Sequence, residues 1–183
     1  MAASLDKQVA GRQAVGEQTV VIRPARMFDA QGMVDYMATL IAERLDTISV
    51  RHCPSLEDER EWVLRTEMSE RILILLAVHG EEVVGMLDLS AGERPDNRHT
   101  GRFGMSIAKR WRGRGIGRSL LSAAIAAARE WPGFCRIELE CVAWNAAGIR
   151  LYESLGFVIE ARKTKAVNLR GRPEDMLLMA LTW

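Results

Sequence analysis

Apolar residues recur along the chain with two periods, and the period separates expected helices from expected strands. Helical spacing of apolar positions is found in 29–45, in a stretch that begins at Ser55, in 116–128 and in 146–155. Short apolar or β-branched runs that end at turn-forming residues predict strands. These runs are 19–23, 72–78, 83–89, 103–108, 137–142, 157–161 and 176–181. The predicted order is β-α-α-β-β-β-α-β-α-β-β, which indicates an α/β protein with an α+β mixed sheet.

Local signals mark where several of these elements begin and end. Ser55 followed by Asp58 has the pattern of a weak capping box at a helix start. Gly156 stands where a left-handed glycine commonly closes a helix. The polar residues at 79–82 predict a turn between two antiparallel strands. Glycine, proline and asparagine in 91–97 predict a loop.

The chain of 183 residues has the size of one domain, and no repeat or linker divides it. Residues 1–18 are polar and show no clear periodicity, so we expect a flexible N-terminal tail there. Residues 19–183 are expected to form the single domain. Hydrophobic residues make up 48% of the chain, which is enough for a sizeable core.

Charge and composition argue against several classes of function. Lys and Arg number 25 and Asp and Glu number 24, so we expect no nucleic-acid partner. Three cysteines and three histidines are scattered without a CxxC pair, and we expect no disulfide framework and no metal site. The chain has no apolar run of about 18 residues and no apolar segment typical of a signal peptide. We therefore expect a cytoplasmic protein with no membrane partner.

The strongest chemical signal is a turn between the strand at 103–108 and the helix at 116–128. It consists of Arg112-Gly113-Arg114-Gly115-Ile116-Gly117-Arg118 and is called the glycine-arginine turn below. Alternate glycines let a backbone adopt positive φ and approach a ligand closely. Unsatisfied N–H groups at the helix start, with arginine charge beside them, favour an anion such as phosphate. The sequence therefore predicts a local anion site here.

Other interpretations of the glycine-arginine turn stay open on the residues alone. Its spacing is GxGxG, whereas dinucleotide folds use GxGxxG, and neither an acidic ribose reader nor a GxxxxGK[ST] motif is present. Arg-Gly-Arg-Gly also occurs in RNA-binding segments, but those are usually repeated and disordered. An arginine-rich surface turn without a ligand fits the composition equally well.

Two segments together resemble the GNAT superfamily of N-acetyltransferases. The coenzyme motif of that family is Arg/Gln-x-x-Gly-x-Gly/Ala, and 112–117 match it in full. The second signature, Asn-x-x-Ala-x-x-Leu-Tyr-x-x-x-Gly-Phe, is similar to 145–157, with Gly148 in place of the usual Ala. Residues 22–25, Ile-Arg-Pro-Ala, look like the family's opening strand. The resemblance covers roughly residues 19–182. It implies a GNAT-like fold with splayed central parallel strands, and transfer of acetyl from acetyl-CoA to a primary amine.

The resemblance also implies a coenzyme site. Backbone groups of the strand before the turn would hydrogen-bond the pantetheine arm, and N–H groups of the turn would bind the pyrophosphate. A residue at the start of the later helix would add a further contact. The coenzyme-binding residues implied in this way are Met105, Ser106, Ile107, Arg112, Gly113, Arg114, Gly115, Ile116, Gly117, Arg118 and Asn145. Acetyl-CoA is then a co-substrate, and no metal is expected.

Two of the implied residues have simpler alternatives. By resemblance, Tyr152 lies near the sulfur and acts as general acid toward the leaving thiolate, and a phenol remains protonated at neutral pH. Its alternative role is that of a core aromatic residue on the inner face of its helix. Asn145 is also a favoured residue type for a helix N-cap, and a capping role and a coenzyme contact can coexist.

The general base is not assigned by the resemblance. Many relatives carry a Glu on the strand before the glycine turn, and Arg102 occupies that position here. His99, a residue type that commonly serves as a base in enzymes, and Glu138 on the next strand are equally ranked candidates. Glu140 lies beside them on that strand, and a water chain to one of these groups is a further possibility. A solvated or salt-bridged residue is the simpler interpretation of each.

Acceptor specificity in the family comes from segments that correspond to 29–70, 90–100 and 163–175. Arginines in these segments would suit a carboxylate, so we expect a small-molecule amine such as an amino acid or an analogue. Protein N-terminal or lysine acetylation is an alternative. A non-catalytic acyl-CoA sensor is another, favoured by the missing Glu at Arg102. The apolar run 176–181 would support a homodimer.

Overall fold

A mixed sheet of eight strands organises the described part of the chain, which comprises residues 11–15, 18–44 and 52–183 of a computed structural model. The strands are β1 Gly11–Val15, β2 Gln18–Pro24, β3 Ile72–His79, β4 Glu82–Ala91, β5 Thr100–Ile107, β6 Arg136–Val142, β7 Val158–Leu169 and β8 Arg172–Thr182. The helices are α1 Ala30–Ala42, α2 Leu56–Met68, α3 Ile116–Arg129 and α4 Ala146–Glu153, with 3-10 turns η1 Met27–Asp29 and η2 Lys109–Trp111. The strand order is β1-β2-β3-β4-β5-β6-β8-β7.

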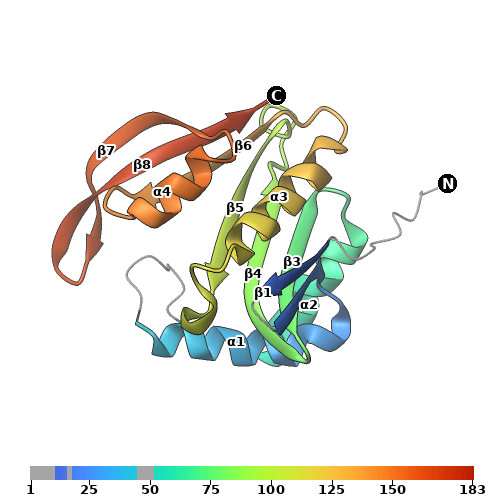
Figure 1. The fold of residues 1–183 in the computed structure, drawn as a ribbon. Helices are drawn as coiled ribbons and strands as arrows, with labels where there is room; N and C mark the ends of the chain where they lie inside the picture. Colours follow the sequence, from blue (N-terminus) through green and yellow to red (C-terminus); the bar gives the residue numbers. More distant parts are fainter. Residues whose placement is uncertain (1–10, 16–17, 45–51) are drawn as a thin grey trace.

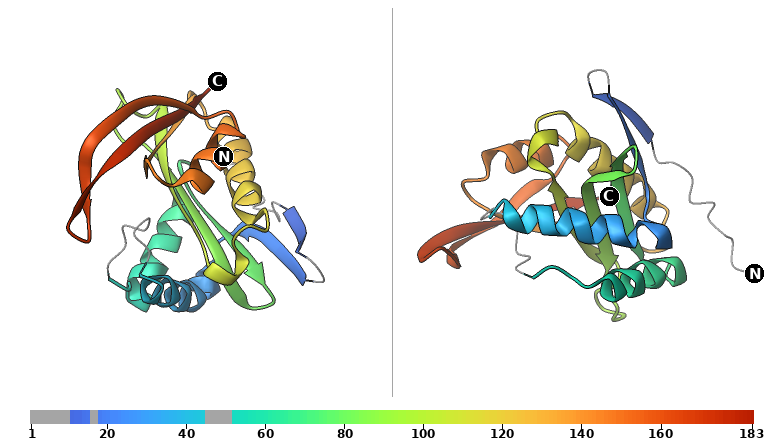
Figure 2. Two further views of the ribbon diagram at one scale, coloured as in Figure 1. Left: turned by 60° about the vertical axis from the view of Figure 1, so that its left-hand side comes forward. Right: turned by 90° about the horizontal axis from the view of Figure 1, so that it is seen from below.

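Helices cover the sheet on both faces. Seen from below in Figure 2, α1 and α2 lie on one side of the strands and α3 lies on the other. Figure 1 shows α4 beside α3, beneath the long hairpin of β7 and β8. Leu87 and Leu89 of β4 and Leu120 and Leu121 of α3 are fully buried, because the apolar stripe of α3 packs on the centre of the sheet. The buried side chains form a single core that holds the central strands rigidly beneath α3.

Local sequence signals fix several element ends as predicted. The backbone N–H of Asp58 donates to Ser55 Oγ at 3.2 Å, and the Ser55 N–H donates to Asp58 Oδ2 at 2.9 Å. This reciprocal pair confirms the capping box at the start of α2. Gly80, with φ of 59°, turns β3 into β4 and confirms the predicted hairpin.

The central parallel strands are splayed. β5 pairs in parallel with β6 only over Thr100–Arg102, opposite Arg136–Glu138. Its other edge is paired with β4 along Gly101–Ile107. Among the described residues, the remainder of β5 therefore has no strand partner on the β6 side. Figure 1 shows the two strands diverging toward the end of β5 that leads to α3. The mixed sheet and the splayed pair that the resemblance implied are both confirmed.

Two regions differ from the sequence-based expectation. Residues 11–15 form β1, which pairs antiparallel with β2, so this part of the expected tail is a strand. Residues 1–10 and 16–17 of that tail lie outside the described residues, as does Leu45 at the end of the first predicted helix. The last hairpin is also longer than predicted: β7 extends to Leu169 although most of its side chains are exposed. Pairing with β8 supplies its backbone hydrogen bonds. The strand can therefore form without the alternation of apolar and polar residues that would predict it from the sequence.

Candidate active site

The glycine-arginine turn has the backbone geometry of an anion site. Gly113 and Gly115 have φ of 72° and 82°, in the left-handed region that favours glycine. Gly115 is the N-cap of α3 and, as a glycine, has no side chain with which to cap this terminus. The first N–H groups of α3 therefore lie uncapped at the positive end of the helix dipole. Such a terminus is suited to phosphate oxygens.

The side chain of Arg112 is bound to protein groups. Its Nε donates to the carbonyl oxygen of Ile107 at 2.8 Å, and its guanidinium pairs with Glu43 just after α1. The second carboxylate oxygen of Glu43 accepts the backbone N–H of Lys109 at 2.9 Å. Glu43 thus links the end of α1 to both ends of the 3-10 turn η2. In this structure Arg112 positions the glycine-arginine turn, and its predicted phosphate contact stays a prediction.

The other two arginines of the turn also contact protein groups. The guanidinium of Arg114 lies 5.5 Å from the ring centre of Trp111, a cation–π distance. Arg118 donates to Ser154 Oγ at 2.6 Å, which ties α3 to the end of α4. Their charges still surround the start of α3, so they add to a positive potential there. The backbone N–H groups provide the directional part of the site.

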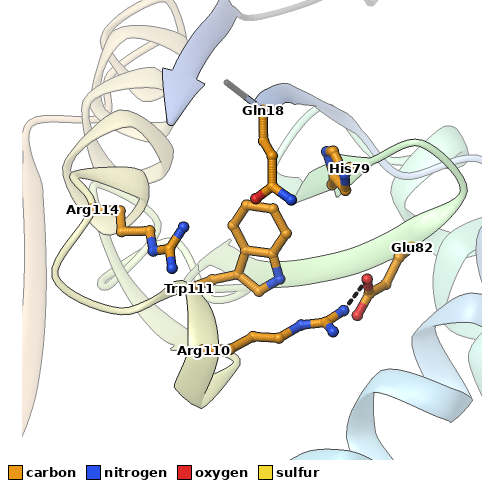
Figure 3. Close-up of a pocket in the computed structure, with 6 residues that line it drawn as sticks. All are labelled: Gln18, His79, Glu82, Arg110, Trp111 and Arg114. Atoms are coloured by element: carbon orange, nitrogen blue, oxygen red, sulfur yellow. Dashed lines mark hydrogen bonds and ion pairs between the residues drawn. The ribbon is translucent and has the colours of Figure 1, made fainter. Parts of the chain in front are cut away.

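A hollow of about 390 Å³ lies behind the turn, on the side of β2 to β4 and away from the splay. Figure 3 shows Trp111 at its centre, between Arg114 on one side and the Arg110–Glu82 ion pair on the other. Trp111 is 3% exposed and packs against the His79 ring with centroids 5.1 Å apart. The indole is therefore a platform beneath the turn and not part of the splay.

Close packing brings α3, α4 and β5 together at the splay. A Cβ added to Gly117 would lie 3.3 Å from Leu151 Cδ2 and 3.5 Å from Met105 Cε. Glycine at this position therefore lets α3 approach both neighbours. On the opposite face of β5, Ser106 accepts a hydrogen bond from the Tyr36 hydroxyl at 2.9 Å. Alternate residues of β5 thus contact opposite layers of the molecule.

Tyr152 on α4 lies on the same face of β5 as Met105. Its ring meets Phe103 edge-on, with centroids 5.9 Å apart, and also contacts Phe157 at 6.0 Å. Burial, with a smaller contribution from Cys141, raises the pKa of Tyr152 to about 12. No described residue hydrogen-bonds its hydroxyl. The phenol is therefore protonated at neutral pH and available to donate.

Asn145 is the N-cap of α4, as one of its two predicted roles requires. Its side-chain oxygen accepts the backbone N–H of Gly148 at 3.1 Å. A Cβ at Gly148 would lie 2.6 Å from Asn145 Nδ2. The departure from the family signature at Gly148 therefore has a local cause, because glycine leaves room for the capping amide. The coenzyme contact of Asn145 stays a prediction.

The two candidate bases lie at the paired end of β5 and β6. Glu138 accepts from Arg102 Nε at 2.7 Å, and its other oxygen pairs with Arg136 at 3.3 Å. His99 is exposed in the loop before β5, where its carbonyl accepts the Cys135 N–H. The structure does not bring His99 or Glu138 together with Tyr152. Their roles as base stay predictions, with Glu138 already neutralised by two cations.

The structure reveals two site residues that the sequence analysis did not single out, Glu43 and Asp88, and gives a partner to Tyr36 of the predicted acceptor segment 29–70. Glu43 anchors the glycine-arginine turn, and Tyr36 contacts β5 at Ser106. Asp88 of β4 is half-buried, and burial raises its pKa to about 6. The available signal for Asp88 was a carboxylate inside the apolar run 83–89. Glu43 had no comparable signal, because its partners are far away in the sequence.

Comparison with known proteins adds independent evidence to this geometry. The model of the acetyltransferase (GNAT) family matches residues 38–157. The L-amino acid N-acetyltransferase AaaT of Escherichia coli K12 is 32% identical over 135 residues, which cover 74% of this chain and 81% of the relative. The chain belongs to the GNAT acetyltransferase family. It is an acetyl-CoA-dependent N-acetyltransferase.

Solved GNAT structures share the fold. A GNAT acetyltransferase from Streptococcus pneumoniae superposes with a TM-score of 0.86 at 27% identity, covering 90% of this chain and 99% of that one. The putative acetyltransferase yncA of Salmonella typhimurium, solved with acetyl-CoA, has a TM-score of 0.79 at 23% identity. The superposition with yncA covers 89% of this chain and 93% of the relative.

The described residues fit the coenzyme that is typical of GNAT enzymes. Positive φ at Gly113 and Gly115 and the uncapped start of α3 suit a pyrophosphate, and the splay leaves a strand edge of β5 for an extended chain with amide groups. No helix in the described ranges has the length and apolar character needed to cross a membrane.

Proposed function

We propose that this GNAT enzyme acetylates the α-amine of an amino acid or of a closely related small molecule. The observation that carries the proposal is the 32% identity to an L-amino acid N-acetyltransferase over most of both chains. The acceptor is expected to contact side chains of β6 on the face of the sheet that α1 and α2 cover.

Paired charges on that face support a zwitterionic acceptor. Arg102 pairs with Glu138 at 2.7 Å, and Lys163 pairs with Glu140 at 2.6 Å. Glu138 and Glu140 alternate along β6 and therefore lie on one face. An amino acid carries the same two charges, and its carboxylate is a bidentate partner for an arginine such as Arg102.

On the donor side we propose the roles that the resemblance implied. The N–H groups from Gly113 to Arg118 bind the pyrophosphate, and the backbone of Met105–Ile107 binds the pantetheine amides. Tyr152 donates the proton to the leaving sulfur. What supports this is the positive φ of the glycines, the open edge of β5 and the buried phenol beside Phe103.

A thiol-release assay with acetyl-CoA tests the acceptor class. The panel contains L-amino acids, the matching amino acid amides, peptides with a free N-terminus and peptides with an internal lysine. Free amino acids are expected to give the highest kcat/KM, and their amides roughly tenfold less, because a charged hydrogen bond to the carboxylate is lost. Turnover with the peptides but not with free amino acids would show that the acceptor is a protein and not an amino acid. Coenzyme binding without any turnover would favour a sensor.

Two variants localise the carboxylate contact. Arg102→Ala is expected to raise KM for the amino acid and to leave KM for its amide unchanged. Arg65→Ala is the matched control, since Arg65 is an exposed arginine on α2 that pairs with Glu61 of the same helix. Equal effects of Arg102→Ala on both acceptors would exclude Arg102 as the carboxylate partner.

A further inference from the structure

The acceptor amine presents a proton problem that the residues considered so far do not solve. An alkylamine with a pKa near 10 is an ammonium ion at neutral pH, so it must lose a proton before its nitrogen can attack. The group that takes this proton has to lie near the splay and has to be free of a cation. Glu138 fails the second condition, because two arginines occupy its oxygens, and His99 fails the first, because it is exposed in the loop before the paired end of β5.

Asp88 meets the geometric conditions. It lies on β4 directly opposite Gly104 of β5. A Cβ built on Gly104 would be 2.8 Å from Asp88 Oδ1, so the carboxylate occupies the space that a side chain at position 104 would fill. Gly104 belongs to the stretch of β5 that has no pairing with β6 in the described structure. At this level of the strand, no β5 side chain separates Asp88 from the splay.

Asp88 and Tyr152 lie on opposite faces of the sheet. Asp88 shares its face with Ser106, two residues beyond Gly104, and Ser106 is bound by Tyr36 of α1. Tyr152 reaches the other face, where its ring meets Phe103. An amine that enters from the α1 side would therefore meet Asp88, while the thiolate leaves toward Tyr152.

The surroundings of Asp88 preserve its basicity. No cation in the described ranges pairs with it, and the ionisable neighbour on α1 is Tyr36. On β5 the nearest charge of the same face is Arg102, which is bound to Glu138. On β3 the register partner is apolar Ile74. Burial holds the pKa at about 6, so the carboxylate is ionised at pH 7 and more basic than an ordinary aspartate.

On α2 the buried ionisable group is Glu59, whose pKa is raised to about 7 by burial and by Asp58. Glu59 is 3% exposed, so an entering amine has no open path to its carboxyl. On β6 the charged groups of the same face are Glu138 and Glu140, each held by a cation, and Arg136, which is bound to Glu138 and Glu160. Among the described carboxylates on this face, Asp88 is the one that is ionised at pH 7, partly exposed and not held in an ion pair.

We propose that Asp88 is the general base that takes the proton of the acceptor ammonium, directly or through one water. The nitrogen lone pair then forms a bond to the acetyl carbon, and the carbon–sulfur bond breaks. Tyr152 protonates the thiolate and regains a proton from the former amine nitrogen. The proton on Asp88 passes to solvent, so the net products are the amide, the free thiol and one proton. This inference rests on the proposed acetylation of an amine.

The test compares Asp88→Asn with the wild type on two nucleophiles. One is the best basic acceptor found in the panel, whichever class it belongs to. The other is hydroxylamine, a weakly basic nucleophile that is largely neutral at pH 7 and needs no prior deprotonation. For the basic acceptor, kcat/KM at pH 7 is expected to fall by roughly 100-fold, within the range for general bases. For hydroxylamine it is expected to change by less than about threefold.

The pH profile gives a second readout that a structural role would not move. In the wild type, kcat/KM for the basic acceptor should fall as the pH drops through about 6, because Asp88 becomes protonated there. The pH profile should therefore show one ionisation near 6. This ionisation should be absent in Asp88→Asn. Ser90→Ala, on the same face of β4, and Glu138→Gln, at the rival base, are the control variants and should retain it. Calorimetry should show acetyl-CoA affinity unchanged in all three variants.

Three results would overturn the proposal. These are an equal loss on both nucleophiles, persistence of the ionisation near 6 in Asp88→Asn, or its loss in Glu138→Gln. If no basic amine is acetylated at any pH, both this inference and the proposed function fall. If a peptide amine is the acceptor instead of an amino acid, only the proposed acceptor class falls, and the comparison is made with that peptide.

Discussion

The two faces of the splayed strands differ in how their chemistry is assembled. On the face proposed for the acetyl donor, the glycine-arginine turn, Met105 and Tyr152 come from one stretch of about 50 residues, and the proposed coenzyme contacts are mostly with backbone groups. On the face proposed for the acceptor, Tyr36, Asp88 and Glu138 come from three separate segments and would act through their side chains. A shared coenzyme can thus be held by a local motif while each acceptor needs its own set of distant side chains.

The largest expected effect tests the donor face. Tyr152→Phe should lower kcat by about 100-fold, because a positioned acid contributes roughly that much, and should leave acetyl-CoA affinity nearly unchanged. Stopped assays of thiol release and calorimetric titration measure the two quantities. Tyr36→Phe is the matched control: it removes the other tyrosine hydroxyl, on the acceptor face, and should change kcat by less than about threefold. A Tyr152→Phe enzyme with the kcat of the wild type would reduce Tyr152 to a packing residue.

The next effect concerns the stability of the acceptor face. The folded pKa of Asp88, about 6, lies above that of an unfolded aspartate, so its contribution to stability is present at low pH and lost as the pH rises from about 4 through 6. Asp88→Asn should therefore be more stable than the wild type at pH 7, by about 2 to 3 kcal/mol, and nearly equally stable at pH 4. Urea unfolding at both pH values measures this. An unchanged or lower stability at pH 7 would contradict the burial of an ionised carboxylate.

The link between the two faces gives a smaller effect. Glu43→Gln removes the carboxylate that holds Arg112 and the Lys109 N–H, so the glycine-arginine turn should loosen. Acetyl-CoA should bind about fivefold more weakly, by calorimetry, because a charge-assisted contact is lost from a turn that must be ordered to bind. Glu82→Gln, which breaks the exposed pair with Arg110, should change affinity less than twofold. Equal effects of the two variants would mean that Glu43 does not organise the turn.

The smallest effect is expected at the start of α4. Gly148→Ala restores the usual residue of the family signature but places a Cβ 2.6 Å from the present position of Asn145 Nδ2. Loss of the cap costs about 1 kcal/mol, and alanine in place of glycine returns a similar amount in the first turn of the helix. The free energy of unfolding should therefore stay within about 0.5 kcal/mol of the wild type in a denaturant titration. A loss larger than about 2 kcal/mol would show that the amide of Asn145 cannot move aside.

Periodicity predicted the central elements because their patterns follow from burial on one face. The helix from Ile116 buries residues at helical spacing as it packs on β4, and Ser55 caps α2 by contacts with residues close to it in the sequence. β1 and the outer half of β7 escaped prediction because an edge strand is specified by its partner's hydrogen bonds. Their side chains carry no such signal.

The same distinction holds within the site. The left-handed glycines and the cap at Asn145 are local properties, so the sequence exposes them directly. The partners of Arg112 and Glu138 depend on which strands and helices become neighbours, and neither ion pair has a sequence pattern. Asp88 is informative only once Gly104 is known to lie opposite it.

The three-residue parallel pairing of β5 with β6 has a mechanical consequence. It is the only strand pairing in the described structure that joins β1 to β5 with β6 to β8, so the sheet has a seam along its middle. A coenzyme whose amide groups bind across the open edge would hold the two parts of the sheet together. Because a ligand that binds only the folded state stabilises it by mass action, the wing formed by β6, β7, β8 and α4 should exchange its amide hydrogens more slowly as coenzyme concentration rises.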